Sequence, residues 1–203
     1  MPTEPTVFIV DDDDAVRRFL KGLIESIDLK VEAYPSAKDF LDAYVSDRPG
    51  CLLLDVRMPG MSGLELQREL KERVIALPVV ILTGHGNVPV AVQAMKAGAV
   101  DFIEKPFNNE LLLDRIQTAV AQSVRSSSER EIQDETSRRL DTLTPRERQI
   151  FDLVVEGETN KAIAHRFSIS EKTVEIHRAN VMRKMRANSL ASLVHMAVGL
   201  KDD

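Results

Sequence analysis

The chain has 203 residues, a length typical of two compact domains, and its single cysteine, Cys51, cannot form an internal disulfide. Because it has neither a run of about 18 uncharged apolar residues nor a signal-like N-terminus, the sequence argues against the membrane and secreted classes, and we expect a soluble cytoplasmic protein. The net charge of −5 is unevenly distributed: residues 1–121 hold 13 basic and 19 acidic residues, whereas residues 141–203 hold 10 and 9, so only the last third suits a polyanion.

The first part of the chain alternates short β-rich apolar runs with longer segments of helical period, which is typical of a parallel sheet flanked by helices. The predicted strands are Val7–Val10, Lys30–Tyr34, Cys51–Leu54, Val79–Leu82 and Asp101–Ile103. Helices are expected to begin near Asp14, Ser36, Gly63, Val88 and Asn108, and Ser62 with Glu65 fits a capping box. We therefore expect residues 1–121 to form an α/β domain with a doubly wound, five-stranded, flavodoxin-like parallel sheet.

Polar side chains stand where the predicted strands end. Asp11 and Asp12 follow the first strand, Asp55 ends the third, Thr83 ends the fourth and Lys105 follows the fifth. Because ligands of open parallel sheets bind outside the carboxyl ends of the strands, these groups are expected to converge on one crevice. Three carboxylates in one place repel one another unless a hard cation neutralises them, so the pattern predicts a Mg²⁺ site.

Asp55 is the best candidate for a nucleophile in this crevice. A carboxylate can attack phosphorus to give an aspartyl phosphate, while a metal ion neutralises the charge on the transferred oxygens. Lys105 would pair with the carboxylate or phosphoryl oxygens, and the Thr83 hydroxyl would donate to one of them. Simpler roles compete with this interpretation: Asp13 and Asp14 are expected only to cap the next helix, and Asp55 taken alone is an ordinary turn residue.

The segments VDDDD, LLLDVRMPGMSG, VVILTGHG and DFIEKPF give residues 7–121 a resemblance to the receiver domains of two-component response regulators. The resemblance implies that Asp11, Asp12 and Asp55 form an acidic pocket. It also implies that the backbone carbonyl of Arg57 is a further ligand of Mg²⁺, with Mn²⁺ as an alternative metal.

The same resemblance implies a conformational switch. Thr83 and Phe102 would form the switch pair, with Phe at a position that is often Tyr in the family, and Lys105 would complete the phosphoryl-binding set. The Lys105–Pro106 peptide bond would be cis. The alternative for Phe102 is a plain core role, because it lies in a buried edge strand.

Residues 122–140 have few apolar side chains, mixed charge and a serine triplet, which together indicate an interdomain linker that can extend the fifth helix. Thr144, Pro145 and Glu147 then combine an N-cap, a proline at the first helical position and a capping-box glutamate. We therefore expect a small all-α domain over residues 141–203.

This second domain contains the pattern of a helix-turn-helix. The segment Asn160–Phe167 is predicted as the scaffold helix, 168–170 as the turn and Glu171–Met185 as the recognition helix. His177 is expected to pack rather than to read bases. The predicted DNA-facing residues are Lys172, Thr173, Glu175, Ile176, Arg178, Ala179 and Arg183.

Each residue type on that face suits a particular contact with DNA. Basic side chains neutralise phosphates, Glu175 can accept from a cytosine amino group, and Ile176 or Ala179 can touch a thymine methyl. A solvated helix face is the alternative. The segment 171–186 carries five basic and two acidic residues, a local +3, so the basic charge is focused on this element.

Gly157, Asn160, Ile163, Phe167, Thr173 and Lys184 stand at the spacings of the LuxR-type helix-turn-helix. Together with the receiver segments, they make the chain resemble the NarL/FixJ class, with TGHG and HRANVMRKM most similar to its FixJ-type members. The resemblance implies a sensor histidine kinase and promoter half-sites in double-stranded DNA as partners, RNA polymerase as a candidate partner, and a homodimer on activation. The apolar stripe of 189–200 either supports that dimer or packs on its own domain.

Two other functions remain open from the residues. A phosphatase or phosphotransferase would share the aspartyl phosphate and magnesium, but it would want a second acid or base near Asp55, and position 57 is arginine. A DNA-binding or scaffold protein independent of phosphorylation is disfavoured by the intact set of Asp55, Thr83 and Lys105. We therefore expect a transcriptional switch that accepts a phosphoryl group on Asp55 and dephosphorylates itself, and not a turnover enzyme.

Overall fold

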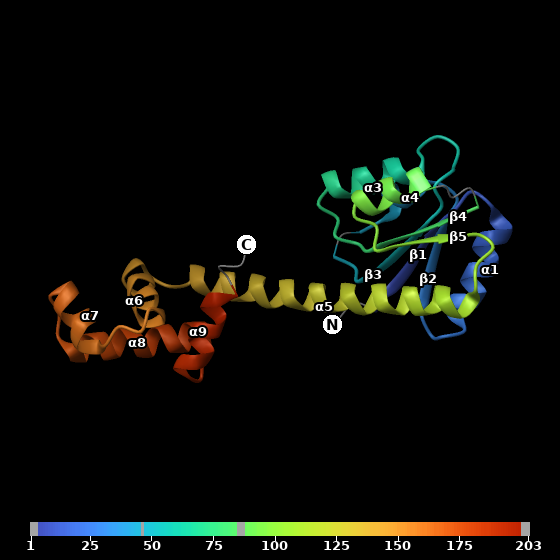
Figure 1. Ribbon diagram of the computed structural model, residues 1–203. Coiled ribbons are helices and arrows are strands. Elements are labelled where there is room, and N and C mark those ends of the chain that lie inside the picture. The colour runs from blue at the N-terminus through green and yellow to red at the C-terminus, as the bar shows by residue number, and fades with distance from the viewer. Residues whose placement is uncertain (1–3, 46, 85–87, 200–203) are drawn as a thin grey trace. The chain divides into compact units, whose positions relative to one another are not determined.

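The computed structural model describes residues 4–45, 47–84 and 88–199. The chain divides into two compact units, Met1–Ser127 and Ser128–Asp203, whose elements are labelled in Figure 1. Each unit has its own hydrophobic core.

The first unit is built on a parallel sheet of five strands in the order β2-β1-β3-β4-β5 (Figure 1). The strands are β1 (Thr6–Val10), β2 (Lys30–Tyr34), β3 (Gly50–Leu54), β4 (Val79–Thr83) and β5 (Asp101–Glu104). In the register of the central strands, Thr6 lies opposite Lys30 on one side and Gly50 on the other. The five predicted strands are confirmed, with differences of one residue at their ends.

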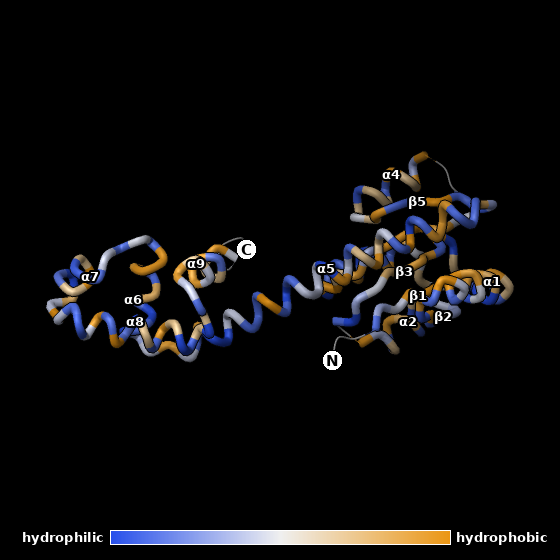
Figure 2. The backbone as a smooth tube through the Cα atoms, turned by 90° about the horizontal axis from the view of Figure 1, so that it is seen from below, coloured by the Kyte–Doolittle hydropathy of each residue, from blue (hydrophilic) through white to orange (hydrophobic). Residues whose placement is uncertain are grey.

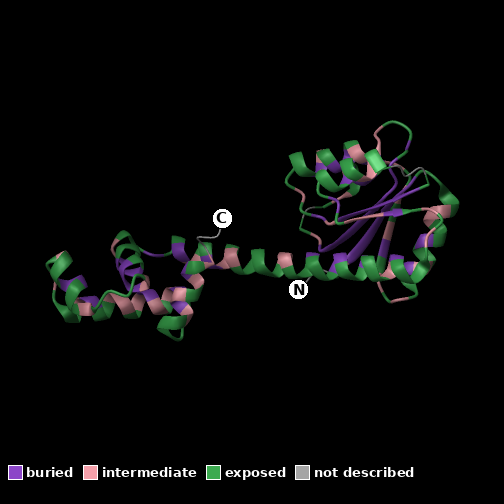
Figure 3. Cartoon of the chain, in the orientation of Figure 1, coloured by how far each residue is buried: buried purple, intermediate pink, exposed green. Residues whose placement is uncertain are grey.

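Helices cover both faces of this sheet. They are α1 (Asp14–Glu25), α2 (Ala37–Ala43), α3 (Gly63–Glu72), α4 (Val88–Lys96) and α5 (Asn109–Asp141). Val7 and Ile9 of β1 pack with residues of α1 and of the first part of α5, whereas Phe8 and Val10 pack with residues of α2, α3 and α4. Successive residues of a strand point to opposite faces, so a strand covered on both sides must be apolar throughout. The doubly wound α/β fold is therefore confirmed, and the central strands are buried and hydrophobic (Figures 2 and 3).

Local side-chain caps fix where the helices begin. The Ser62 hydroxyl accepts from the Glu65 backbone N–H, and the Glu65 carboxylate accepts from the Ser62 N–H at 2.8 Å, which confirms the predicted capping box at α3. Asp13 caps α1 by accepting from the N–H groups of Ala15 and Val16. The simple capping role expected for Asp13 is thus the one observed.

Helix α5 is the longest element, with 33 residues. The segment 122–140, predicted as a linker that can extend the fifth helix, is helical throughout, and the division between the two units falls inside α5, between Ser127 and Ser128. The Ser123 hydroxyl, which is buried, accepts from the Gly50 N–H at 3.0 Å. This bond fastens α5 to the beginning of β3 within the first unit.

The second unit is entirely helical in its described part. After the end of α5 it contains α6 (Pro145–Val155), α7 (Asn160–Phe167), α8 (Glu171–Met185) and α9 (Leu190–Val198). Its core includes Ile150, Ile163, Val174, Val181 and Leu193. The scaffold and recognition helices have the predicted bounds, and the capping box of Thr144 and Glu147 is confirmed. Of the predicted segment 189–200, α9 covers the greater part, and Leu200 lies outside the described residues.

No helix within the described ranges has the length and apolarity needed to cross a bilayer.

Candidate functional site

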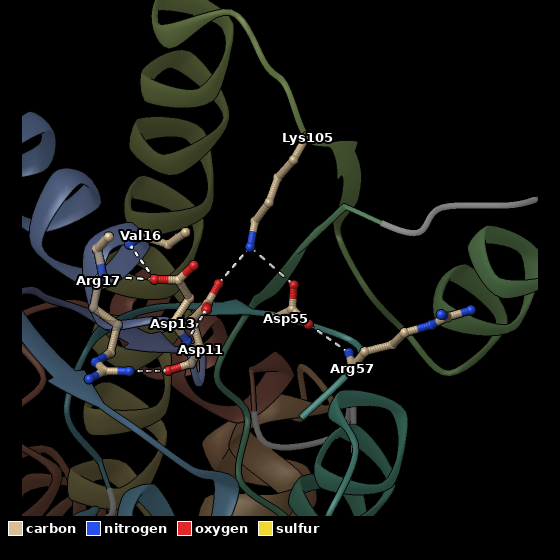
Figure 4. Close-up of polar contacts among 8 residues, drawn as sticks. Asp11, Asp13, Val16, Arg17, Asp55, Arg57 and Lys105 are labelled. Atoms are coloured by element: carbon tan, nitrogen blue, oxygen red, sulfur yellow. Dashed lines mark hydrogen bonds and ion pairs between the residues drawn. The ribbon is translucent and has the colours of Figure 1, made fainter. Parts of the chain in front are cut away.

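A lysine bridges two carboxylates at the carboxyl ends of the strands. The Lys105 ammonium, just after β5, lies 2.6 Å from Asp11 Oδ2, after β1, and 3.1 Å from Asp55 Oδ1, after β3 (Figure 4). Both carboxylates are buried, with Asp11 3% exposed and Asp55 8% exposed. The sheet order places β1 and β3 side by side, which is why residues 44 positions apart in the chain meet at one ammonium group.

The remaining carboxylate oxygens are held by the backbone. Asp55 Oδ2 accepts from the Arg57 N–H at 2.6 Å, and Asp11 Oδ1 accepts from the Asp13 N–H at 2.9 Å. Burial raises the pKa of Asp55, although the charge of Lys105 opposes the rise. Burial alone would lower the pKa of Lys105, but its hydrogen bond to Asp11 and the two carboxylate charges raise that pKa overall. The pocket is thus a preformed cluster of opposite charges, sheltered from solvent.

The loop after Asp55 returns close to its starting point. The Gly63 N–H donates to the Val56 carbonyl at 2.9 Å, and a Cβ added at Gly63 would lie 2.2 Å from the Asp55 carbonyl oxygen. No side chain can be placed there without moving the backbone of Asp55. The glycine at the start of α3 is therefore a packing requirement of the pocket.

The other predicted pocket residues lie at the expected strand ends with different exposures. Thr83 is fully buried at the end of β4, whereas the side chains of Asp12 and Arg57 are exposed. Phe102, in β5, is half-buried and packs against the core on the α2–α4 side of the sheet, so it is less enclosed than a plain core residue. The Lys105–Pro106 peptide bond is cis, as predicted.

The chemistry of the pocket fits a hard divalent cation. Asp11 and Asp55 supply carboxylate oxygens, the ligand type that Mg²⁺ prefers. Asp12, the third carboxylate of the predicted set, is exposed where the chain leaves β1. In the part of the chain that the structure describes, no three His, Cys, Asp or Glu side chains are grouped to hold a metal ion by themselves. A cation here would therefore need further oxygens, from a backbone carbonyl, from Asp12 or from water.

In the second unit, α8 presents a mixed face to solvent. The exposed residues on it include five of the seven predicted DNA-facing residues: Lys172, Glu175, Ile176, Ala179 and Arg183. Ile176 is 55% exposed, so more than half of this aliphatic side chain is open to a contact from outside the domain. The Lys172 ammonium lies 2.9 Å from Glu175 Oε2, so these two charges are paired along the helix.

The other two predicted residues are half-buried. The Thr173 hydroxyl lies 2.8 Å from the Ser170 hydroxyl at the N-cap of α8. Arg178 Nη1 donates to Asn160 Oδ1 at 3.0 Å, which links the middle of α8 to the first residue of α7. His177 is half-buried as well, in keeping with the packing role expected for it.

The local charge of α8 is smaller than the sequence count indicates. Lys184 donates to Glu147 Oε2 at 2.6 Å and to the Thr142 carbonyl at 2.9 Å, so its ammonium holds α8 against the start of α6. The hydrogen bond from Lys184, with that from the Thr144 N–H, lowers the pKa of the buried Glu147 to about 2. The local count of +3 over residues 171–186 included Lys184, whose charge is neutralised by a partner 37 residues earlier in the chain.

From the sequence, Glu147 was predicted only as a capping residue and Asn160 only as a motif position. Neither the Glu147–Lys184 pair nor the Asn160–Arg178 bond has a local signal in the sequence. Each joins two helices whose packing must be known first.

Two family models match the chain. The model described as "Response regulator receiver domain" matches residues 7–117, and the model described as "Bacterial regulatory proteins, luxR family" matches residues 141–197. The first range contains the acidic pocket, and the second contains α6, α7, α8 and nearly all of α9.

Several known proteins are similar to the chain over nearly its whole length. The transcriptional regulatory protein FixJ of Azorhizobium caulinodans is 46% identical over 198 residues, which are 98% of this chain and 94% of that protein. The response regulator protein TodT of Pseudomonas putida is 44% identical over 97% of this chain and 86% of its own length. A solved structure of the response regulator StyR is 43% identical, with a TM-score of 0.89 over 97% of this chain and 99% of that one.

Proposed function

Since the chain belongs to the two-component response regulators that join a receiver domain to a LuxR-type DNA-binding domain, we propose that phosphorylation of Asp55 by a histidine kinase controls its binding to promoter DNA. The observation that supports this most directly is the Lys105 bridge between Asp55 and Asp11 at the carboxyl edge of the sheet. A structural ion pair needs one acid and one base. Here two buried acids share one ammonium, which leaves an excess negative charge that a divalent cation can neutralise.

The proposed reaction is a phosphoryl transfer between side chains. An Asp55 carboxylate oxygen attacks the phosphorus of a phosphohistidine, the P–N bond breaks, and its electron pair stays on the departing imidazole. In this proposal Asp11, Asp12, Asp55 and the Arg57 carbonyl would hold Mg²⁺, or Mn²⁺ in its stead, which would supply positive charge opposite the transferred oxygens. The Lys105 ammonium then exchanges the Asp55 carboxylate for a phosphoryl oxygen.

The switch proposed for the receiver uses the two remaining residues of the set. The Thr83 hydroxyl donates to the phosphoryl group, and the space it leaves admits the ring of Phe102, which is half-buried in this structure. The rearranged face of α4 and β5 then favours a homodimer. Such a change works only if phosphorylation stabilises one of the two states more than the other.

Dimerisation matters because one copy of the DNA-binding unit has little charge to offer. Residues 141–203 carry ten basic and nine acidic side chains, and Lys184 is already paired. Affinity for DNA grows with the number of phosphates neutralised, so two copies on paired half-sites bind far better than one. In this proposal the chain acts in the cytoplasm as a switch and not as a turnover enzyme, with RNA polymerase as its candidate further partner and no membrane.

The first experiment tests the phosphoacceptor. The full-length protein is incubated with phosphoramidate and Mg²⁺, and intact mass and peptide mapping locate the label. We expect one phosphoryl group per chain on the peptide containing Asp55, none in Asp55→Asn, and full labelling in the control Asp13→Asn, because asparagine caps a helix as well as aspartate does. Labelling retained in Asp55→Asn, or steady release of phosphate from phosphomonoesters, would refute the switch.

The second experiment tests the output. Oligomeric mass is measured by sedimentation with and without phosphoramidate, and a bound duplex is selected from a random pool with the phosphorylated protein. We expect a monomer to become a dimer and the duplex to contain paired half-sites. A chain that stays monomeric, in wild type and Asp55→Asn alike, contradicts the proposed link to dimerisation.

A further inference from the structure

We infer that Asn160 is a positioning residue for DNA binding, which holds the Arg178 guanidinium ready to contact a DNA phosphate. The inference rests on the proposed DNA-binding function of the second unit and assigns Asn160 a role within it. Arg178 was one of seven residues predicted to face DNA, whereas Asn160 was predicted only to occupy a position of the helix-turn-helix pattern.

The geometry separates Arg178 from the two lysines of α8, and also from Arg183, whose neutral acceptor, Asn180 Oδ1 at 3.3 Å, belongs to the same helix. Lys172 pairs with Glu175 on the same helix, and Lys184 is paired with Glu147. Arg178 instead donates from Nη1 to the neutral amide oxygen of Asn160 at 3.0 Å. A neutral acceptor orients the guanidinium without cancelling its positive charge, so the charge stays available to an anion.

The position of this bond also matters. Asn160 is the first residue of α7, directly after the N-cap Thr159, whose hydroxyl accepts from the Ala162 N–H. Arg178 lies between the exposed face of α8 and its buried face, and its side chain is half-buried. A long side chain at such a border loses rotamer freedom when it binds, and a bond that fixes one end of the guanidinium removes part of that cost in advance.

The guanidinium keeps donors for a second partner. It carries five N–H groups in a planar fork, and the bond to Asn160 uses one of them. The N–H groups on the opposite edge of the fork can therefore donate to phosphate oxygens while Nη1 still donates to Asn160. In this arrangement Asn160 touches no DNA and acts only through Arg178.

The test uses the full-length phosphorylated protein and the duplex selected above. Affinity is measured by fluorescence anisotropy from low to moderate salt for wild type, Asn160→Ala, Arg178→Ala and the double variant. Because a phosphate contact adds about 0.9 to the slope of log K against log salt, Arg178→Ala is expected to flatten the slope by about that amount per bound protomer. Asn160→Ala is expected to weaken binding about two- to tenfold with the salt slope unchanged. The phosphate contact of Arg178 remains, but its guanidinium is no longer oriented before DNA binds.

The double variant shows whether Asn160 acts through Arg178 or independently of it. If Asn160 acts through Arg178, adding Asn160→Ala to Arg178→Ala causes no further loss of affinity. Alanine is tolerated at the first position of a helix whose N-cap is intact, and hydrogen exchange of α6 amides checks that the second unit remains folded. Asn188→Ala and Arg138→Ala, which replace exposed residues elsewhere in this unit, serve as matched controls and should leave affinity and slope unchanged.

Three results would overturn the inference. They are wild-type affinity in Asn160→Ala at every salt concentration, an unchanged salt slope in Arg178→Ala, and an effect of Asn160→Ala that persists in full in the double variant. In all three the wild type still binds the duplex, so the proposed DNA-binding function survives. A wild-type chain that binds no duplex overturns the function and the inference together.

Discussion

Replacing Glu147 by glutamine removes the carboxylate charge that holds the recognition helix α8 to α6. The Glu147 side chain is 6% exposed, and its oxygen lies 2.6 Å from the Lys184 ammonium. Its pKa falls from 4.5 to about 2 in the folded chain. At about 1.4 kcal/mol per pKa unit, the charged form of Glu147 stabilises the second unit by about 3 kcal/mol at neutral pH. Glu147→Gln should lower the free energy of unfolding by about that amount or somewhat less, since the amide oxygen can still accept.

The same pKa shift also predicts how the effect of Glu147→Gln on stability changes with pH. A carboxyl group whose pKa is lowered by folding stabilises the protein above its unfolded pKa, and the stabilisation disappears as the pH falls towards the folded pKa. For Glu147 the stabilisation is complete well above pH 4.5 and is lost between that value and about pH 2. The difference between wild type and Glu147→Gln should therefore shrink to about 1.4 kcal/mol at pH 3.

Hydrogen exchange measured by mass spectrometry is the suitable assay, because peptides of α6 report on the second unit alone in the full-length chain. The slowest amides of α6 give the free energy of opening at pH 7 and at pH 3. Glu158→Gln is the matched control, because Glu158 is an exposed glutamate of the same unit. A Glu147→Gln protein as stable as wild type at pH 7, or a difference of the same size at both pH values, would refute the reasoning.

Three further changes test other parts of the structure. Gln67 is buried; its Nε2 donates to the Ala94 carbonyl, which also accepts from the Ala99 N–H, whereas its Oε1 has no hydrogen-bond partner in the described residues. Gln67→Leu removes one satisfied and one unsatisfied polar group and leaves Ala94 with a donor, so it should leave the melting temperature of the first unit about unchanged in calorimetry; a clear fall would contradict this. Lys105→Met should raise the pKa of Asp55 further in a carboxyl ¹³C titration, since burial would no longer be opposed, and should slow labelling by phosphoramidate about 10- to 100-fold; an unchanged pKa would count against the bridge. Ile176→Ala should weaken binding to the selected duplex by about 1 kcal/mol without changing the salt slope, because the lost contact is apolar; a flatter slope would be inconsistent with that contact.

Local signals account for most of what could be predicted. Side chains within one helical turn of each other determine the capping boxes at Ser62 and Thr144 and the bounds of α7 and α8. Both partners of each such contact lie close together in the sequence, so a short stretch of residues is enough to predict them. The convergence of Asp11, Asp55 and Lys105 was predictable for a different reason. Strand ends of a parallel sheet meet at one edge whatever the lengths of the connections between them.

The unpredicted features depend on how elements pack. Lys184 was counted as free charge because nothing near it in the sequence marks Glu147 as its partner. The sequence could not show that Asp11 is buried and Asp12 exposed, because both are aspartates that follow β1. Their exposure depends on the point at which the chain turns away from the strand. The composition of 122–140 indicates few buried contacts, but it does not show where one unit ends, and the division at Ser127 falls inside a continuous helix.

Gly63, at the start of α3, makes the position of Asp55 depend on the length of the loop between them. Since any side chain at Gly63 would collide with the carbonyl of Asp55, the six intervening positions from Val56 to Met61 and the cap at Ser62 must always bring the chain back to the same point. Inherited or engineered variation in this loop is thus expected to be restricted to changes that keep its closure, and an insertion is expected to displace the proposed phosphoacceptor even though Asp55 itself is not replaced. In a survey of variants, position 63 would be grouped with the pocket despite contributing no chemistry to it.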